Sequence, residues 1–219
     1  MKRGKIQLMT NHTKFASGRL ALSLAALLLA GCGGARPSKY YQLTVPGDAA
    51  PADDPNPLPV DLLIGRIAAP GLYHEDQIVY SSGGEHMGTY EYQRWAEPPV
   101  EMIQEVILRQ LRSSGRFRNV NLLRSNVHGD FLLHGHLYDF KEVSAGSTVA
   151  RVTIELELRD VKTHKTLWTH FYTHDEPAAA KDITAVVDAL NRNIQQGIAQ
   201  ARTLLEQYFT EHPPAPSTP

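Results

Sequence analysis

The stretch from Val149 to Arg159 alternates between apolar and polar residues and constrains the fold more than any other part of the chain. Successive side chains of a strand point to opposite faces of a sheet, so a period of two predicts a strand with one buried face. The buried face would consist of Ala150, Val152, Ile154, Leu156 and Leu158. The opposite, charged face meets solvent or an interface, so a homo-oligomer built on this face is possible.

A helix is predicted at about residues 98–113. Pro98 and Pro99 suit a first helical turn, where missing amide hydrogens would be unpaired anyway, and Gly115 is a residue type that ends helices. Apolar residues recur at helical spacing and predict one face packed on a sheet: Val100, Ile103, Val106, Ile107 and Leu111.

A second, longer helix is predicted at about residues 182–208. Asp182 is a favoured N-cap residue, and an apolar stripe runs from Ile183 to Tyr208. The polar face of this stripe is not strongly basic, so the stripe is expected to cover sheet rather than to lie on a membrane.

The remaining strands are shorter and are separated by turn-forming residues. Besides 149–159, strands are predicted at 39–45, 60–68, 77–82, 89–95, 117–123, 131–143 and 166–173, with an extended connection at 46–59. The fold class that follows is α/β: a single domain with a mixed, mostly antiparallel sheet covered by the two helices.

The N-terminus has the pattern of a secretory leader. Residues 1–31 contain five basic and no acidic residues, and an apolar run from Leu20 to Ala30 is about half as long as a membrane span requires. The quartet Leu29-Ala30-Gly31-Cys32 resembles the lipobox of bacterial lipoproteins. That resemblance implies removal of the leader and covalent diacylglyceryl and N-acyl groups on Cys32, with no other cofactor; the alternative is that Cys32 is a free thiol.

The mature part is mildly acidic and large enough for one domain. The whole chain has a formal net charge of −1, and loss of the five basic residues of the leader leaves −6, which argues against nucleic-acid binding. The predicted organisation is a signal peptide at 1–31, the lipidated cysteine and a short tether at 32–38, an α/β domain at 39–210 and a disordered Pro-rich tail at 211–219.

The sequence lacks the common catalytic motifs. It has no Gly-rich phosphate loop, no G-x-S-x-G elbow and no H-E-x-x-H, so we expect no enzyme and no catalytic residue. His134 and His136 lie on one predicted strand, and His170 and His174 on another. Four imidazoles could bind zinc, but an alternating strand also places histidines on its solvent face without any metal, and we expect no metal site.

Aromatic residues and an arginine cluster in "GTYEYQRWAEPP", residues 88–99. Tyr90, Tyr92, Arg94 and Trp95 are of the types that dominate protein interfaces, which makes them candidates for binding a partner. The alternative is that Trp95 fills the core where strand meets helix, with Tyr90 and Tyr92 packed against the sheet.

Several segments together resemble the ABC-type transport auxiliary lipoprotein family. They are "YYQL", "GRIAAPGLYHEDQIVY", "TYEYQRWAEPPVEMIQEVILRQL", "SGRFRNV" and "LELRDVKTHKTLW", and they extend over about residues 39–208. The most specific piece is Arg94-Trp95 followed by the proline pair Pro98-Pro99 and a helix.

The resemblance implies an α/β sandwich and a role without catalysis beside an MCE-type lipid transport system, with an MCE-domain protein and ABC transporter or permease subunits as partners. Gly33 follows the cysteine in place of the aspartate that retains lipoproteins at the inner membrane, so the resemblance implies the outer membrane, facing the periplasm. Two alternatives remain open: a lipid carrier with an apolar groove between sheet and helix, and a zinc-binding periplasmic protein.

Overall fold

The structure, a computed structural model, describes residues 36–44, 57–124 and 126–214. Cys32 and the residues before it lie outside this range, as does most of the connection predicted at 46–59. The described residues from Ser38 onward belong to one compact unit.

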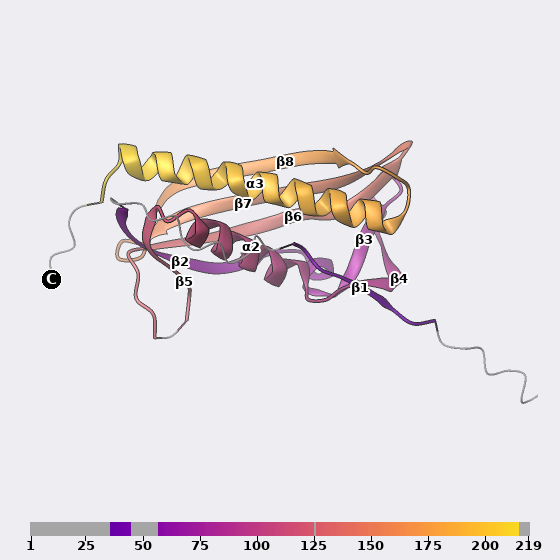
Figure 1. Cartoon of the computed structure of the whole chain (residues 1–219), viewed down its shortest axis with the longest axis horizontal. Helices are drawn as coiled ribbons and strands as arrows, with labels where there is room; N and C mark the ends of the chain where they lie inside the picture. Colours follow the sequence, from indigo (N-terminus) through magenta and orange to yellow (C-terminus); the bar gives the residue numbers. More distant parts are fainter. Residues whose placement is uncertain (1–35, 45–56, 125, 215–219) are drawn as a thin grey trace, which may run out of the picture. The chain divides into compact units, whose positions relative to one another are not determined.

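Eight strands form one mixed sheet, shown with its helices in Figure 1. The strands are β1 (Lys39–Tyr41), β2 (Leu58–Ala68), β3 (Gln77–Ser81), β4 (Gly88–Trp95), β5 (Phe117–Leu122), β6 (Phe131–Ala145), β7 (Ser147–Asp160) and β8 (Thr166–Pro177). A short 3₁₀ helix, η1 (Gly71–His74), precedes β3.

The long strand β6 organises the sheet because both of its edges are used. One edge pairs antiparallel with β7, which in turn pairs antiparallel with β8. The other edge pairs in parallel with β2 along its first half and with β3 near its end, and β6 has a register irregularity between Leu137 and Asp139. β5 extends the β2 side, and β4 and β1 extend the β3 side.

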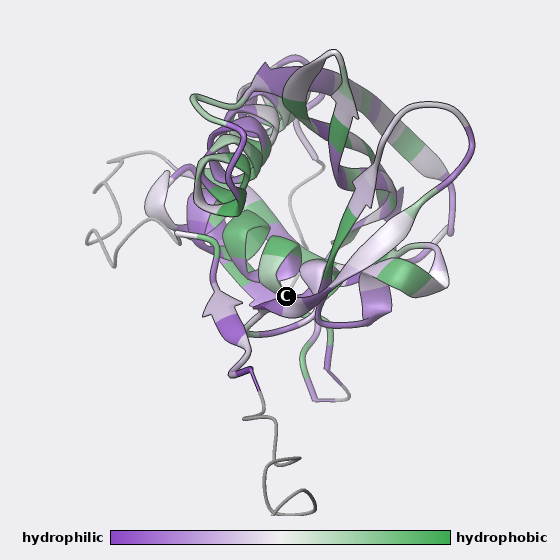
Figure 2. Ribbon diagram, turned by 90° about the vertical axis from the view of Figure 1, so that its right-hand side faces the viewer, coloured by the Kyte–Doolittle hydropathy of each residue, from purple (hydrophilic) through white to green (hydrophobic). Residues whose placement is uncertain are grey.

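Two helices cover one side of the sheet: α2 (Pro99–Ser113) and α3 (Ile183–Glu211). α3 packs on β7 and β8, while α2 packs on β2, β5 and α3. The end-on view in Figure 2 shows the strands curving around the two helices. The apolar residues between these layers form one continuous core.

Local signals in the sequence explain both helices. Pro98 precedes α2, and Gly115, just past its end, has a φ of 65°, a conformation that glycine adopts at little cost. At the start of α3, the Asp182 side chain accepts a hydrogen bond from the amide of Ala185. The two predicted helices and the α/β class are confirmed.

The main differences from the sequence-based prediction lie at element ends. β1 stops at Tyr41 instead of residue 45, β2 begins at Leu58 within the predicted connection, and β8 continues to Pro177 instead of residue 173. α3 continues to Glu211, and in its last turn Phe209 is buried while Tyr208 is only partly so. α2 also packs on α3 as well as on the sheet, which explains why Gln110 is buried.

The mixed character of the sheet is confirmed. Four of its strand pairings are parallel and three are antiparallel, but the two long antiparallel pairings, β6–β7 and β7–β8, hold most of the paired residues. Among the described residues, no helix has the length and apolar character needed to cross a membrane.

Candidate partner-binding surface

Trp95, at the end of β4, lies inside the core. Its exposed fraction is 1%, and its ring packs at 5.5 Å from that of Phe140 on β6. The Trp95 amide donates to the carbonyl of Asp76, and the next amide, of Ala96, donates to Tyr41. Trp95 therefore fixes the end of β4 against β1 and β3, and its side chain is not on the surface.

Tyr90, on the same strand, is held by an internal hydrogen-bond network. Its hydroxyl donates to the buried carboxylate of Glu142 at 2.7 Å, and its ring lies 4.9 Å from that of Tyr80. The Ser144 hydroxyl donates to the other oxygen of Glu142. Burial, followed by the contact with Glu142, raises the pKa of Tyr90 well above its ordinary value. The hydroxyl of Tyr90 is thus committed to a contact within the fold.

Tyr92 and Arg94 are the candidates of this strand without a buried hydrogen-bond partner, although Tyr90 is partly exposed as well. Both are partly exposed, and Arg94 donates to Asp76 at 2.6 Å. A hydrogen bond to Glu91 raises the pKa of the Tyr92 phenol. In the sheet, Arg94 is registered with Tyr40 of β1, whose side chain is 64% exposed. We call Tyr40, Tyr92 and Arg94 the β1–β4 edge.

The sequence pointed to Tyr92 and Arg94 but not to Tyr40. The signal that could have found it is the pair Tyr40-Tyr41 in a predicted strand, because neighbouring side chains of a strand point to opposite faces. Tyr41 is partly buried and donates its hydroxyl to Gln93 at 3.0 Å, which leaves Tyr40 on the exposed face.

The segment after β1 is fastened to α3. Leu43 is buried in the core, with an exposed fraction of 2%. The amide of Thr44 donates to the Asn191 side chain at 3.0 Å, and the Gln195 side chain donates to the carbonyl of Thr44. Gln195 in turn accepts a hydrogen bond from Gln110 of α2 at 2.7 Å. These contacts hold β1, and with it Tyr40, in a fixed position.

The four histidines considered as zinc ligands lie on two faces of the sheet. His134 is registered with Glu157 on the outer face of β7, whereas His170 is registered with Leu156 on the face that packs against α3. By the same alternation, His136 shares the face of His134, and His174 shares that of His170. The sheet therefore separates the two pairs, and the described residues contain no group of three or more metal-binding side chains.

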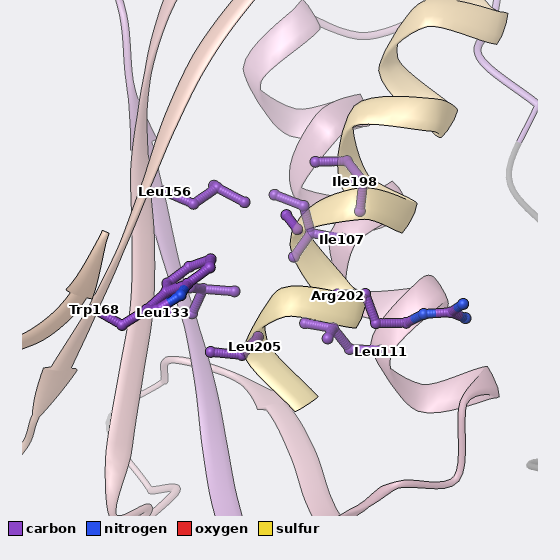
Figure 3. Close-up of a pocket in the computed structure, with 9 residues that line it drawn as sticks. Ile107, Leu111, Leu133, Leu156, Trp168, Ile198, Arg202 and Leu205 are labelled. Carbon is purple, nitrogen blue, oxygen red and sulfur yellow. The ribbon is translucent and has the colours of Figure 1, made fainter. Parts of the chain in front are cut away.

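A small apolar cavity remains between the helices and the sheet (Figure 3). It is lined mainly by Ile107, Leu111, Leu133, Leu156, Trp168, Ile198 and Leu205, and the guanidinium of Arg202 points away from it. Its volume of about 10 Å³ is close to the minimum that holds a single water. A cavity of this size has no room for an acyl chain.

The charged face of β7, predicted as a possible interface between copies, is paired with its neighbouring strands. Arg151 donates to Asp175 of β8 at 2.6 and 2.7 Å, and Glu155 accepts from Tyr138 of β6 at 2.8 Å. Phe171 on this face is 57% exposed. The sequence identified the charges, whereas the exposed ring of Phe171 becomes apparent only from the strand register.

Comparison with known proteins places these features in a family context. The family model described as the ABC-type transport auxiliary lipoprotein component matches residues 41–201. No curated protein matches the chain at a significant level.

Two solved structures share the fold. Protein XCC0632 from Xanthomonas campestris superposes with a TM-score of 0.69 at 18% identity, covering 80% of this chain and 98% of the other. A second, described as an uncharacterized protein, has a TM-score of 0.61 at 15% identity and covers 78% of this chain and 99% of its own. At these identities the likeness concerns the fold.

Proposed function

The chain belongs to the ABC-type transport auxiliary lipoprotein family, and from this premise we propose that it is the lipid-anchored docking component of an MCE-type lipid transport system at the outer membrane. The observation that carries the proposal is a family match over residues 41–201 that begins nine residues after a lipobox cysteine, Cys32. Gly33 after that cysteine supports outer-membrane placement, with the folded α/β domain, called the body below, facing the periplasm.

In this proposal the body acts by presenting a fixed surface. The cavity of about 10 Å³ has no room for an acyl chain, and the described residues contain no metal-binding cluster. A protein of this kind contributes by binding and positioning its partners. The partners proposed are an MCE-domain protein and the ABC transporter or permease subunits of the same system.

The proposed contact surface is centred on Tyr92 and Arg94. Both are partly exposed on β4, and tyrosine and arginine are the residue types most enriched at interface hot spots. Two other residues hold the same strand in place: Trp95 is buried against Phe140, and Tyr90 is hydrogen-bonded to Glu142.

Co-purification of the full lipidated chain from membranes, with mass spectrometry of what it retains, tests this role. The unmodified chain should retain an MCE-domain protein, and the Tyr92→Ala/Arg94→Glu double variant should lose most of it. Leu204→Ala, at a partly exposed position on α3, is the matched control and should retain the partner. Equal retention by the double variant would contradict the proposed surface, and absence of any MCE or permease subunit from the unmodified chain would contradict the proposed system.

A further inference from the structure

Among the large apolar and aromatic side chains that the structure describes, Tyr40 has the highest exposed fraction. It is 64% exposed, compared with 57% for Phe171 and 51% for Leu123. Tyrosine joins an apolar ring to a polar hydroxyl, and such residues are enriched where one end of a side chain meets hydrocarbon and the other meets water.

The backbone around Tyr40 is held in place by contacts with the rest of the fold. Tyr40 is registered with Arg94, and the residues just after β1 are fixed by burial of Leu43 and by the two hydrogen bonds of Thr44 to α3. Its partner strand, β4, is itself fixed by the buried Trp95. The ring is therefore presented outward from a fixed position.

Tyr40 also lies close in sequence to the predicted anchor. Cys32 precedes it by eight residues, and a fully extended chain of that length spans at most about 29 Å. With the acyl chains of Cys32 in the membrane, the tether keeps β1 within that distance of the bilayer surface. No other exposed aromatic residue among those described is so close to Cys32 along the chain.

We propose that the ring of Tyr40 lies in the interfacial layer of the anchoring membrane, which leaves Tyr92 and Arg94 of the β1–β4 edge for the proposed protein partner at the membrane surface. This inference rests on the proposed lipid anchor and specifies how the body is oriented on it. The occupant proposed for Tyr40 is lipid, because the short tether brings this edge to the bilayer before any protein is bound.

The surroundings of Tyr40 favour membrane contact through insertion of its aromatic ring over electrostatic attraction to anionic lipid. Lys39 beside it in sequence is exposed, and the Arg94 guanidinium across from it is paired with Asp76. Because Arg94, the charged residue registered with Tyr40, is neutralised by Asp76, the depth of the ring in the membrane should change little with salt or with the fraction of anionic lipid.

The mature lipoprotein, reconstituted in vesicles of phosphatidylethanolamine and phosphatidylglycerol without any partner protein, provides the test. The sulfur of Cys32 carries the lipid, so Tyr40→Cys introduces the one free thiol for a nitroxide label, and Phe171→Cys is the control at a similarly exposed aromatic position on β8. The ratio of oxygen to nickel-chelate accessibility, measured by spin resonance, should be at least about twofold higher at position 40 than at 171. Equal ratios would overturn the proposal and would leave a protein partner as the occupant of Tyr40.

A label-free measurement on the unsubstituted chain guards against disturbance by the label. Hydroxyl-radical oxidation in vesicles should modify Tyr40 several-fold more slowly than Phe171, although Tyr40 is the more exposed of the two in the body alone. Faster oxidation of Tyr40 would contradict the inference. The intact mass of the same preparation tests the anchor separately from the orientation. Absence of lipid on Cys32 contradicts the proposed anchor. A lipidated chain whose Tyr40 remains in contact with water contradicts only the proposed orientation.

Discussion

At the scale of single residues, the fully buried Asn193 on α3 connects the helix to the sheet. Its side-chain amide donates to the carbonyls of Ala150 and His174, each at 2.8 Å, and its oxygen accepts from the Tyr172 hydroxyl at 2.7 Å. A buried polar group that loses its partner destabilises the fold more than an exposed one, because water cannot replace the bond.

Asn193→Ala is therefore expected to lower the free energy of unfolding by about 3 kcal/mol, since it leaves two carbonyls and a hydroxyl without this partner. Denaturant unfolding followed by circular dichroism measures the loss. Asn191→Ala, two residues away, removes one hydrogen bond to the Thr44 amide at the surface and should cost about 1 kcal/mol or less. Equal losses in the two variants would contradict the role assigned to Asn193.

The partly buried histidine His170 should make stability depend on pH. Burial lowers its pKa below the ordinary value of 6.5, and burial does the same for His134 despite the opposing effect of Glu157. Between the folded and unfolded pKa values the unfolded chain binds more protons, so stability is fully present above about pH 6.5 and is lost as the pH falls below it.

Urea unfolding at pH 7.5 and at pH 5.5 tests this sign. The free energy of unfolding should fall toward the lower pH, and His170→Gln should reduce that fall because glutamine does not titrate. His128→Gln, in an exposed loop, is the control and should keep the original pH dependence. If His170→Gln left the pH dependence of the free energy of unfolding unchanged, that result would contradict a contribution of His170 to the loss of stability at low pH.

At the scale of elements, local periodicity was sufficient to predict most helices and strands. The alternation of 149–159 and the helical spacing after Pro98 each reflect one buried face, and the five residues assigned to the inner face of β7 are all buried. The pairing of β6 could not be predicted in this way. Its two partners on one edge, β2 and β3, both lie far before β6 in the sequence, and no local pattern records which distant strands meet.

The candidate site shows the same division between local and non-local information. Residue type alone identified Tyr92 and Arg94, but the core position of Trp95 depends on Phe140, and the exposure of Tyr40 depends on the pairing of β1 with β4. The sequence shows two histidines on each of two predicted strands, which could bring the four together. The strand register shows instead that the two pairs lie on opposite faces of the sheet.

The last turn of α3 gives a prediction at this scale. Phe209, one residue past the helix end expected from the sequence, is 1% exposed and its ring lies 4.9 Å from that of Phe131 and 6.2 Å from that of Phe117. Phe209→Ala should lower the free energy of unfolding by about 3 to 5 kcal/mol, as expected for removal of a buried aromatic ring.

The neighbouring variant Tyr208→Ala is the control for that experiment. Tyr208 is only partly buried, so its loss should cost about 1 kcal/mol or less in the same denaturant titration. A larger loss at 208 than at 209 would mean that the helix is rotated from the position described here.

At the scale of the whole molecule, Cys32 is proposed to determine where the body is held. Cys32→Ser removes the sulfur that would carry the lipid, so the leader should remain uncleaved and the chain should be absent from the outer-membrane fraction. The body should keep its thermal unfolding transition, because its hydrophobic core is built from residues between Leu43 and Phe209. Normal processing together with normal outer-membrane location of this variant would contradict the anchor.

The anchor, the short tether and the β1–β4 edge form one functional arrangement in our proposal. The tether places the body close to the membrane, the buried Trp95 and Leu43 fix β4 and β1, and Tyr92 and Arg94 are left for a partner whose end arrives at the membrane surface. A rigid body with a filled core suits this role, since the surface that it presents does not depend on a bound ligand.

Site-specific photocross-linking in living cells tests this arrangement most directly. A photoreactive residue at position 92 of the full lipidated chain should capture an MCE-domain protein, whereas the same residue at position 204 on α3 should not. Capture of no MCE or permease subunit from position 92, with the chain correctly anchored at the outer membrane, would contradict the central claim that this protein docks a lipid transport system there.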